Sequence, residues 1–463
     1  MSVFHLRWDH ADLIMYYATT GAQLQSVLSK LIEVQNRDDV SLDTINDTYC
    51  QIVDILRSCA DLSVPSCRKN FLKFWWDQEM GELKHQSIAS CIAWKAAGRP
   101  HSGPIFDRYR KDKLAYRNGI RIRQRDEKLF YTNDLHEALL KKQGKVFWNC
   151  WRSKFECSKR TIKHVDGVTD VNVIAEHFAS HFSNVCTSSS TEGAKRLRDV
   201  YERMRAEYCG SVDDSCYRFD AELVEKVVAK LKRGKAAGLD GLTSEHLQYS
   251  HPLLPVVLAK LFNLMIQSGH VPPQFGESFT VPIIKSNHNV YNKSLTVDDF
   301  RGISVSPVVS KVFEHCILER YEKFLTTSDN QFGFKKRSGC THALYTLRCA
   351  VNYYNSLGST VNLCALDISK AFDKMNHHGL FIKLMHRRVP VNLLQVLEKW
   401  FMLSVTCVKW GSVLSRSFKL TCGIRQGGVL SPHIFALYID SVVDRVKASN
   451  VGCYYKKAVL LQR

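Results

Sequence analysis

The sequence lacks the long apolar segments that membrane or secreted proteins need. No run reaches the roughly 18 apolar residues of a membrane span, and the longest candidate, around residues 253–262, is interrupted by Lys260. A signal peptide is also excluded at the start, where Arg7, Asp9 and Asp12 interrupt any apolar stretch. We therefore expect an intracellular protein of the nucleus or cytoplasm, neither secreted nor bound to a membrane.

Cysteine pairs with metal-binding spacing are missing as well. The chain has 16 cysteines, yet no two are spaced as Cys-x-x-Cys, and Cys340 with His342 alone is a poor zinc site. The cytosol and nucleus keep thiols reduced, so we expect free cysteines and no structural metal.

Acidic residues are few relative to basic ones: 64 Lys and Arg stand against 45 Asp and Glu, a formal net charge of +19. More than half of this excess lies in residues 108–163, where Tyr109, Tyr116, Trp148 and Trp151 are interleaved with the basic residues. Arginine neutralises phosphates and aromatic faces stack on unpaired bases, so the mixture favours RNA or single-stranded DNA binding. A solvated basic helix anchored by its tryptophans would look the same. The candidate nucleic-acid-binding residues are Arg108, Arg110, Lys111, Arg117, Arg121, Arg123, Arg125, Arg152 and Lys154.

The length of 463 residues allows two or three domains, and 45% apolar with 24% charged residues is usual for globular proteins. Apolar residues at helical spacing predict amphipathic helices over residues 20–35, 221–232 and 254–267. Gly234 and Gly269 are expected to end the last two. Strand and helix signals alternate in the second half of the chain, which predicts an α+β or α/β arrangement there.

The segment VNLCALDISKAFDKMNHHGLFIKLM, residues 361–385, is the most informative. Its apolar run over residues 361–368 predicts a buried strand, with Asp367 near the strand's end and Phe372 and Asp373 on a following helix. A carboxylate that ends a buried strand is costly unless it binds a cation or finds donors. An aspartate that caps the following helix would explain the pattern equally well.

Two other segments place polar residues near glycines or strand ends. LTCGIRQGGVLSPHIFALYID, residues 420–440, holds Gln426 among glycines that let a backbone approach a ligand closely, although an ordinary strand-to-helix turn has similar residues. ESFTVPIIK predicts a strand, and DDFRGISVSPVVSKVFE follows it. In these segments Lys285 and Arg301 come after short strands, a good position for binding a triphosphate. Taken singly, each is also explained as a surface charge.

In this order, the segments resemble the reverse transcriptase (RNA-directed DNA polymerase) of LINE-type non-LTR retrotransposons. The resemblance runs from about residue 219 to about residue 452. LKRGKAAGLDGLTSEHL, FRGISVSPVVSKVFE and NQFGFKKRSGCTHAL look like blocks of the fingers, ALDISKAFD like motif A and GIRQGGVLSP like motif B. Upstream, WDHADLIMYY and FLKFWWDQEM resemble the region after the family's endonuclease, and VIAEHFASHFSNVC the stretch before the fingers.

The resemblance implies RNA-templated DNA synthesis by two-metal nucleotidyl transfer, with an RNA template, a DNA primer and deoxynucleoside triphosphates as partners. Asp367 would be the catalytic residue and would bind Mg²⁺, with the carbonyl of Ile368 nearby. The nucleotide-binding residues would be Phe372, as a steric gate against a 2′-hydroxyl, Gln426 at the nucleotide, and Lys285 and Arg301 at its phosphates.

The fold that the resemblance implies is α+β, with right-hand polymerase fingers and an incomplete palm, no thumb, and a largely helical basic region in front. The expected domains are residues 1–190 as the helical basic region, 191–218 as a linker, 219–360 as fingers, and 361–463 as a partial palm with motifs A and B.

The chain departs from the family in one motif. The Tyr/Phe-x-Asp-Asp hairpin that supplies two further carboxylates is absent, since the Asp-Asp pairs at residues 38–39, 213–214 and 298–299 all precede Asp367. We therefore expect a truncated product with incomplete catalytic carboxylates, doubtful Mg²⁺ binding and no polymerase activity of its own.

Two residues after motif B could replace these carboxylates only poorly. Asp440 and Asp444 lie on the helix that motif B predicts, which does not easily present both at a metal site. Two alternatives stay open: a non-catalytic RNA or single-stranded nucleic-acid-binding protein that uses the polymerase remnant as a scaffold, and self-association that completes the site with a second copy.

Overall fold

The computed structural model contains two compact units. Residues 66–163, with the residues before position 6, form one, called here the hairpin unit; residues 6–65 and 164–463 form the other, the main unit. The structure describes residues 4–35, 41–68, 78–140, 164–187, 191–211, 217–285, 295–335, 338–368, 370–449, 453–455 and 458–461.

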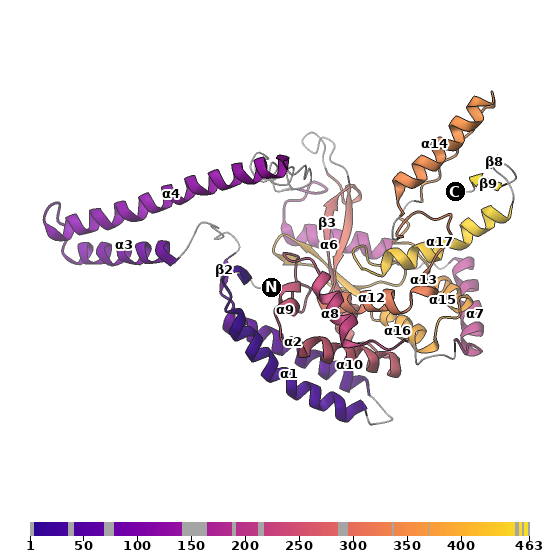
Figure 1. The fold of residues 1–463 in the computed structure, drawn as a ribbon, viewed down its shortest axis with the longest axis horizontal. Coiled ribbons are helices and arrows are strands. Elements are labelled where there is room, and N and C mark those ends of the chain that lie inside the picture. The colour runs from indigo at the N-terminus through magenta and orange to yellow at the C-terminus, as the bar shows by residue number, and fades with distance from the viewer. Residues whose placement is uncertain are drawn as a thin grey trace. The chain divides into compact units, whose positions relative to one another are not determined.

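Two helices form the hairpin unit, α3 (Gln78–Ala96) and α4 (Pro104–Leu140) (Figure 1). The ring of Trp94 on α3 stacks on that of Tyr109 on α4, with 4.6 Å between the centroids. Near the other end of α3, Arg123 Nη2 of α4 donates to Glu79 Oε2 at 2.6 Å. The short strands of this part are β1 (Phe4–Leu6) and β2 (Ser66–Arg68).

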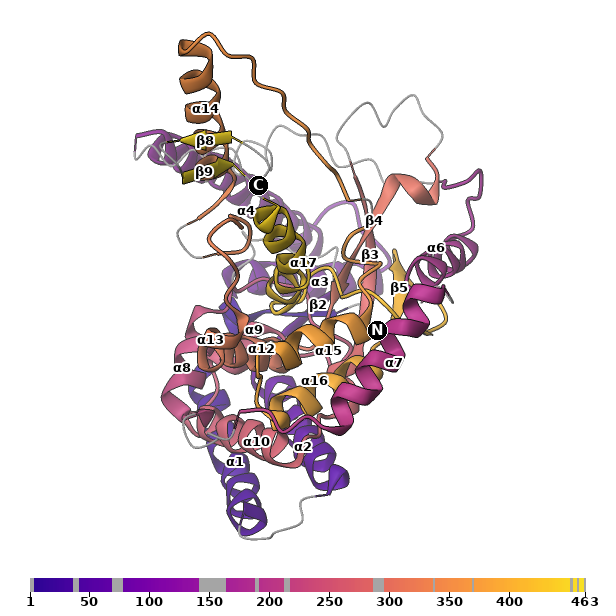
Figure 2. The same cartoon turned by 90° about the vertical axis from the view of Figure 1, so that its right-hand side faces the viewer.

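A mixed sheet lies at the centre of the main unit, with strand order β4-β3-β5-β6 and β7 also paired to β5 (Figure 2). Strands β3 and β4 form an antiparallel pair in which Ile283 is opposite Arg301, whereas β3 and β5 are parallel. The strands are β3 (Glu277–Ile284), β4 (Phe300–Val305), β5 (Val405–Trp410), β6 (Val413–Leu414) and β7 (Phe418–Lys419), with a separate pair β8 (Cys453–Tyr455) and β9 (Ala458–Leu461).

Most helices of the main unit contribute apolar side chains to one buried core that extends from Tyr16 to Leu437. This arrangement confirms the predicted α+β class. The helices are α1 (Leu13–Gln35), α2 (Leu42–Ser63), α6 (Val171–Val185), α7 (Glu192–Ala206), α8 (Ala221–Lys230), α9 (Ser244–Gln248), α10 (Leu253–Ser268), α11 (Pro273–Gly276), α12 (Val308–Arg320), α13 (Glu322–Leu325), α14 (Cys340–Ser356), α15 (His377–His386), α16 (Val391–Met402) and α17 (Ser431–Ala448), with the short 3₁₀ turns η1 (Trp8–His10) and η3 (Val297–Asp299). Among the described helices, none is long and apolar enough to cross a membrane.

The three amphipathic helices predicted from apolar spacing are confirmed as α1, α8 and α10. The Asp220 side chain caps α8 by accepting from the Leu223 N–H at 2.7 Å, and Gly269 ends α10 in the left-handed conformation with φ of 67°. The strand predicted for ESFTVPIIK is confirmed as β3.

The buried strand predicted over residues 361–368 is wrong. The segment has no strand pairing, and the side chain of Leu366 is 90% exposed. An apolar segment becomes a buried strand only where a neighbouring strand pairs with it, and no described strand does so here. The helix expected next also begins later, at His377, because Asn376 caps it by accepting from the Gly379 N–H at 2.9 Å. Phe372 and Asp373 therefore lie in a turn.

Part of the predicted linker, residues 191–218, forms helix α7, which packs on the main unit. Tyr201 Oη donates to Glu398 Oε1 at 2.7 Å, and Arg205 Nε donates to the same atom at 2.9 Å. Helix α7 is therefore packed against α16, whereas a linker was expected here. The domain boundaries themselves stay a prediction.

A mostly buried carboxyl gives the fold a pH dependence. Asp240 accepts a hydrogen bond from Tyr49 Oη at 3.0 Å, and burial raises its pKa to about 6 although the neighbouring donors oppose this. A carboxyl with a folded-state pKa above its unfolded value favours folding at low pH, and this contribution is lost as the pH rises through about 6.

We therefore expect wild type to lose up to about 3 kcal/mol of unfolding free energy relative to Asp240→Asn between about pH 4 and pH 7. Urea denaturation of both proteins across this range measures the difference. Parallel pH profiles for the two proteins would contradict the assignment.

Candidate functional site

A cavity of about 400 Å³ in the main unit brings together four residues that the sequence singled out. Lys285, Arg301, Phe372 and Gln426 all line it. They come from three separate segments: the β3–β4 hairpin, the turn before α15 and the loop before α17.

The two basic residues lie at the same end of the β3–β4 hairpin. Lys285 directly follows β3, and its backbone N–H donates to the carbonyl of Asp299 at 2.9 Å. The prediction that Arg301 follows a strand is wrong, because Arg301 is the second residue of β4 itself. The antiparallel register sets both cationic side chains at one mouth of the cavity, a suitable arrangement for an anionic ligand.

Backbone hydrogen bonds hold the Gln426 loop against the other two segments. The Ile424 N–H donates to the Phe372 carbonyl at 2.8 Å, and the Ser304 N–H of β4 donates to the Gln426 carbonyl at 2.7 Å. The Gln426 side chain donates through Nε2 to Asp373 Oδ1 at 3.1 Å. The loop is therefore positioned from both sides.

Glycine is required where this loop passes β4. Gly427 has φ of 118°, a value that residues with a side chain rarely adopt, and a Cβ there would lie 2.6 Å from the Ser304 carbonyl oxygen. The close approach explains why a glycine follows Gln426 in the sequence.

Gly427→Ala should destabilise the protein by about 2–4 kcal/mol, through backbone strain and displacement of the loop. Gly411→Ala is the matched control, because Gly411 has φ of 60° but nothing within 4 Å of an added Cβ. Urea denaturation of both variants separates the effect of the close contact with Ser304 from the cost of a positive φ. If both variants were destabilised equally, the contact of the added Cβ with Ser304 would have no measurable cost.

Phe372 is fixed by aromatic packing. Its ring stacks on Phe435 of α17 with 4.6 Å between centroids, and Phe334 meets it edge-on at 6.3 Å. These contacts hold the ring in a defined orientation, and Phe372 is one of the residues that line the cavity.

Asp373 is a cavity residue that the sequence analysis did not select. Burial raises the pKa of its carboxyl, while the hydrogen bond from Gln426 and the nearby charges of Lys370, Lys285 and His181 lower it. Its only sequence signal is its place directly after Phe372.

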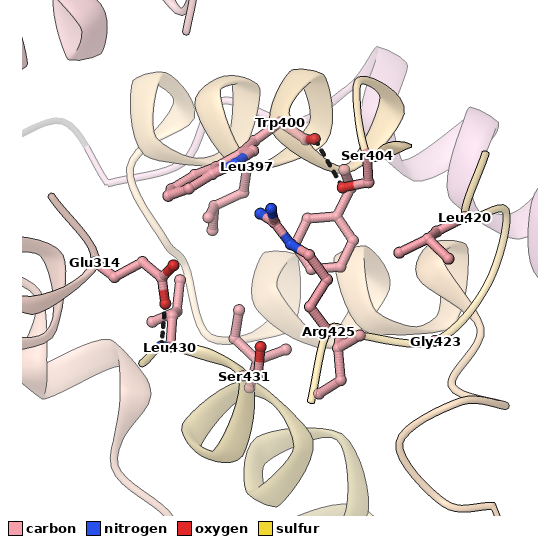
Figure 3. Close-up of a pocket in the computed structure, with 12 residues that line it drawn as sticks. Glu314, Leu397, Trp400, Ser404, Leu420, Gly423, Arg425, Leu430 and Ser431 are labelled. Carbon is pink, nitrogen blue, oxygen red and sulfur yellow. Dashed lines mark hydrogen bonds between the residues drawn. The ribbon is translucent and has the colours of Figure 1, made fainter. Parts of the chain in front are cut away.

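Two side chains of opposite charge, the buried Glu314 and the partly buried Arg425, line a small cavity of about 40 Å³ (Figure 3). Arg425 Nη1 donates to the Phe275 carbonyl at 3.1 Å, and Glu314 Oε2 accepts from the Leu430 N–H at 2.6 Å. Burial raises the pKa of Glu314 and lowers that of Arg425, and attraction between the two opposes both shifts. The pair anchors the loop on either side of Gln426.

The predicted metal ligand Asp367 does not join this cavity. It lies in the exposed segment 361–368, although the next residue, Ile368, lines the cavity. Within the described part of the chain, no group of three or more His, Cys, Asp or Glu residues is arranged to hold a metal ion. The residues present do not fit a complete Mg²⁺ site, so we derive no reaction step through a metal.

The predicted nucleic-acid-binding residues belong to the hairpin unit. Tyr109, expected to stack on bases, stacks on Trp94, and Arg123 is paired with Glu79. The exposed candidates on α4 are Arg108, Arg110, Lys111, Arg117 and Arg121. The Arg125 side chain and the residues Trp148, Trp151, Arg152 and Lys154 lie outside the described parts.

The comparisons with known proteins agree with the resemblance drawn from the motifs. Residues 285–456 match the family model of reverse transcriptase (RNA-dependent DNA polymerase). The chain is 25% identical over 277 residues to a probable RNA-directed DNA polymerase from transposon X-element of Drosophila melanogaster, covering 57% of this chain and 29% of that protein. It is 25% identical over 288 residues to the RNA-directed DNA polymerase from mobile element jockey of the same species, covering 60% and 30%.

A third relative is the Pol polyprotein from type-2 retrotransposable element R2DM of Drosophila melanogaster, 22% identical over 231 residues, which are 50% of this chain and 21% of that protein. The chain thus spans about three tenths or less of the length of these relatives. Residues 285–456 thus match the reverse transcriptase family, and the chain is similar to RNA-directed DNA polymerases of non-LTR retrotransposons.

Proposed function

We propose that the cavity binds the sugar and triphosphate of a deoxynucleoside triphosphate for RNA-templated DNA synthesis. One observation carries the proposal: Lys285, Arg301, Phe372 and Gln426, from three segments of the chain, line one cavity. The basic residues would neutralise the phosphates, Gln426 would contact the nucleotide, and the Phe372 ring would exclude a 2′-hydroxyl.

The finer architecture belongs to the same proposal. Residues 219–360 would act as the fingers of a right-hand polymerase and residues 361–463 as part of its palm, with RNA template and DNA primer held beside the cavity. Asp367 would be one ligand of a Mg²⁺ centre that needs further carboxylates, so we propose no reaction step through the metal.

Binding of dTTP to the full chain, measured by isothermal titration calorimetry, tests the cavity assignment. Arg301→Gln should weaken binding about tenfold, because a charge-assisted contact to phosphate is lost. Arg348→Gln, an exposed basic residue on α14, is the control and should bind as wild type does. Equal affinities for Arg301→Gln and wild type would remove Arg301 from the site.

Primer extension on an RNA template with Mg²⁺ tests whether this chain synthesises DNA alone. With Asp367 as the single aspartate of the proposed metal centre, we expect no incorporation by wild type or by Asp367→Ala. Incorporation by wild type that disappears in Asp367→Ala would show that another carboxylate completes the centre, and would overturn the proposal that this chain is inactive alone.

A second candidate function is RNA binding by the hairpin unit, which the exposed basic residues of α4 favour. Arg110, Arg117 and Arg121 are spaced by 7 and 4 residues, so they lie along one face of the helix. Replacing all three by Gln should make the slope of log K for RNA binding against log salt concentration less steep by about 2. Arg123→Gln should have less effect, because Glu79 already holds that guanidinium. An unchanged slope in the triple variant would exclude this face.

A further inference from the structure

Helix α6 supplies a basic side chain to the cavity from outside the reverse transcriptase domain. The domain match begins at residue 285, whereas α6 covers Val171–Val185. His181 of this helix lines the same cavity as Lys285 and Arg301, and its side chain is only 16% exposed. The cavity is therefore not built by the matched residues alone.

Packing on the sheet fixes the place of His181. The ring of Phe178, one turn earlier, lies 4.9 Å from that of Phe300 on β4 and 5.2 Å from that of Trp410 on β5. Phe182 lies so close to β4 that a Cβ on Gly302 would be 3.2 Å from its ring. Since aromatic anchors flank it on the same helix, His181 is held at the cavity by α6 as a whole.

Two basic groups lie near the carboxylate of Asp298 beside the cavity, and a third binds the backbone of the same residue. His181 Nε2 lies 3.8 Å and Lys370 Nζ 4.0 Å from Asp298 Oδ1, and Lys285 Nζ donates to the Asp298 carbonyl at 2.6 Å. The two distances to the carboxylate exceed those of hydrogen bonds, and the Asp298 side chain is 71% exposed. The carboxylate is thus held loosely, and a more highly charged anion could displace it.

We propose that His181 binds a phosphate of the nucleotide triphosphate, and that the Asp298 carboxylate occupies this place until the triphosphate displaces it. The proposal deepens the function proposed above and rests on it. It adds one residue from the upstream helix to the ligand contacts and involves no covalent step. Asp298 then lowers the affinity for anions by competing for the same cations.

The charges around His181 give the site a pH dependence. Burial lowers the pKa of His181, Lys370 and Lys285 lower it further, and Asp298 and Asp166 raise it. A phosphate oxyanion in contact with the ring favours the protonated imidazole, so binding should take up a proton. Affinity should accordingly rise as the pH falls, and more so in wild type than in a variant without the imidazole.

Calorimetric titration of the full chain with inorganic triphosphate, in EDTA to exclude divalent metals, tests the proposal. His181→Gln should weaken binding about three- to tenfold, and Asp298→Asn should strengthen it about two- to fivefold. His177→Gln is the matched control, since His177 is exposed on the same helix one turn earlier and should bind as wild type does. Lowering the pH from about 8 to about 6 should widen the gap between wild type and His181→Gln.

The outcomes separate this inference from the function on which it rests. If Arg301→Gln weakens binding but His181→Gln does not, the nucleotide cavity stands and His181 is no part of it. If Asp298→Asn binds more weakly than wild type, the competing role of Asp298 is wrong, and this holds even if His181→Gln fails to fold. If triphosphate does not bind to the wild-type protein at all, both proposals are wrong.

Discussion

Replacing Glu314 by alanine should lower the unfolding free energy by about 1–3 kcal/mol, because a buried hydrogen-bond acceptor is lost and Arg425 loses a nearby opposite charge. Glu314 is 4% exposed and accepts from the Leu430 N–H at 2.6 Å, so the substitution also leaves this backbone donor without its partner. Figure 3 shows both side chains at the wall of the same small cavity, behind the Gln426 loop.

Glu319→Ala is the matched control for this substitution. Glu319 lies on the same helix, α12, but pairs with Lys226 at the surface, so its loss should leave the urea midpoint nearly unchanged. Removing both charges at once, as Glu314→Leu with Arg425→Met, should recover only part of the lost stability, because the Leu430 N–H still lacks its acceptor. If Glu314→Ala were as stable as Glu319→Ala, the pair would not stabilise the loop.

Local patterns in the sequence were sufficient for the elements whose partners lie nearby. The apolar spacing of α10 and the glycine that ends it depend on adjacent residues, and both appear in the structure as expected. The strand expected over residues 361–368 had the same quality of local signal but needed a distant strand to pair with. Apolar composition is compatible with such a strand, but the strand forms only where a neighbouring strand pairs with it.

The candidate site was predictable in part. Lys285, Arg301, Phe372 and Gln426 were selected through motif order, and no property of the separate segments shows that they meet in one cavity. His181 was missed because it lies more than a hundred residues before Lys285, in the segment VIAEHFASHFSNVC, to which the motif comparison assigned no site residue. A single histidine beside a phenylalanine on a helix is usually a packing residue, so proximity to the cavity was the missing information.

Residues with buried charges were equally hard to assign from sequence. The sequence places Arg425 in a glycine-rich loop beside a potential ligand, yet its guanidinium donates to the backbone carbonyl of Phe275. Its role depends on Glu314, more than a hundred residues earlier.

Asp440 was considered as a replacement metal ligand, and its surroundings assign it a different role. This carboxylate on α17 is 4% exposed, and both of its oxygens accept hydrogen bonds. It accepts from the Ser328 N–H at 3.1 Å, from Gln331 Nε2 at 2.8 Å and from Arg387 Nη2 at 2.6 Å. It therefore ties the loop after α13 and the end of α15 to α17, and it has no geometry left for binding a metal ion.

Asp440→Ala should accordingly lower the unfolding free energy by about 3–5 kcal/mol, since Arg387 and the Ser328 N–H lose their shared acceptor. Asp440→Asn should cost less, because an amide oxygen still accepts one of these bonds. Asp444→Ala, an exposed carboxylate one turn along the same helix, should leave the urea midpoint unchanged. Equal midpoints for Asp440→Ala and Asp444→Ala would mean that the network does not hold the three elements together, and would reopen Asp440 as a ligand.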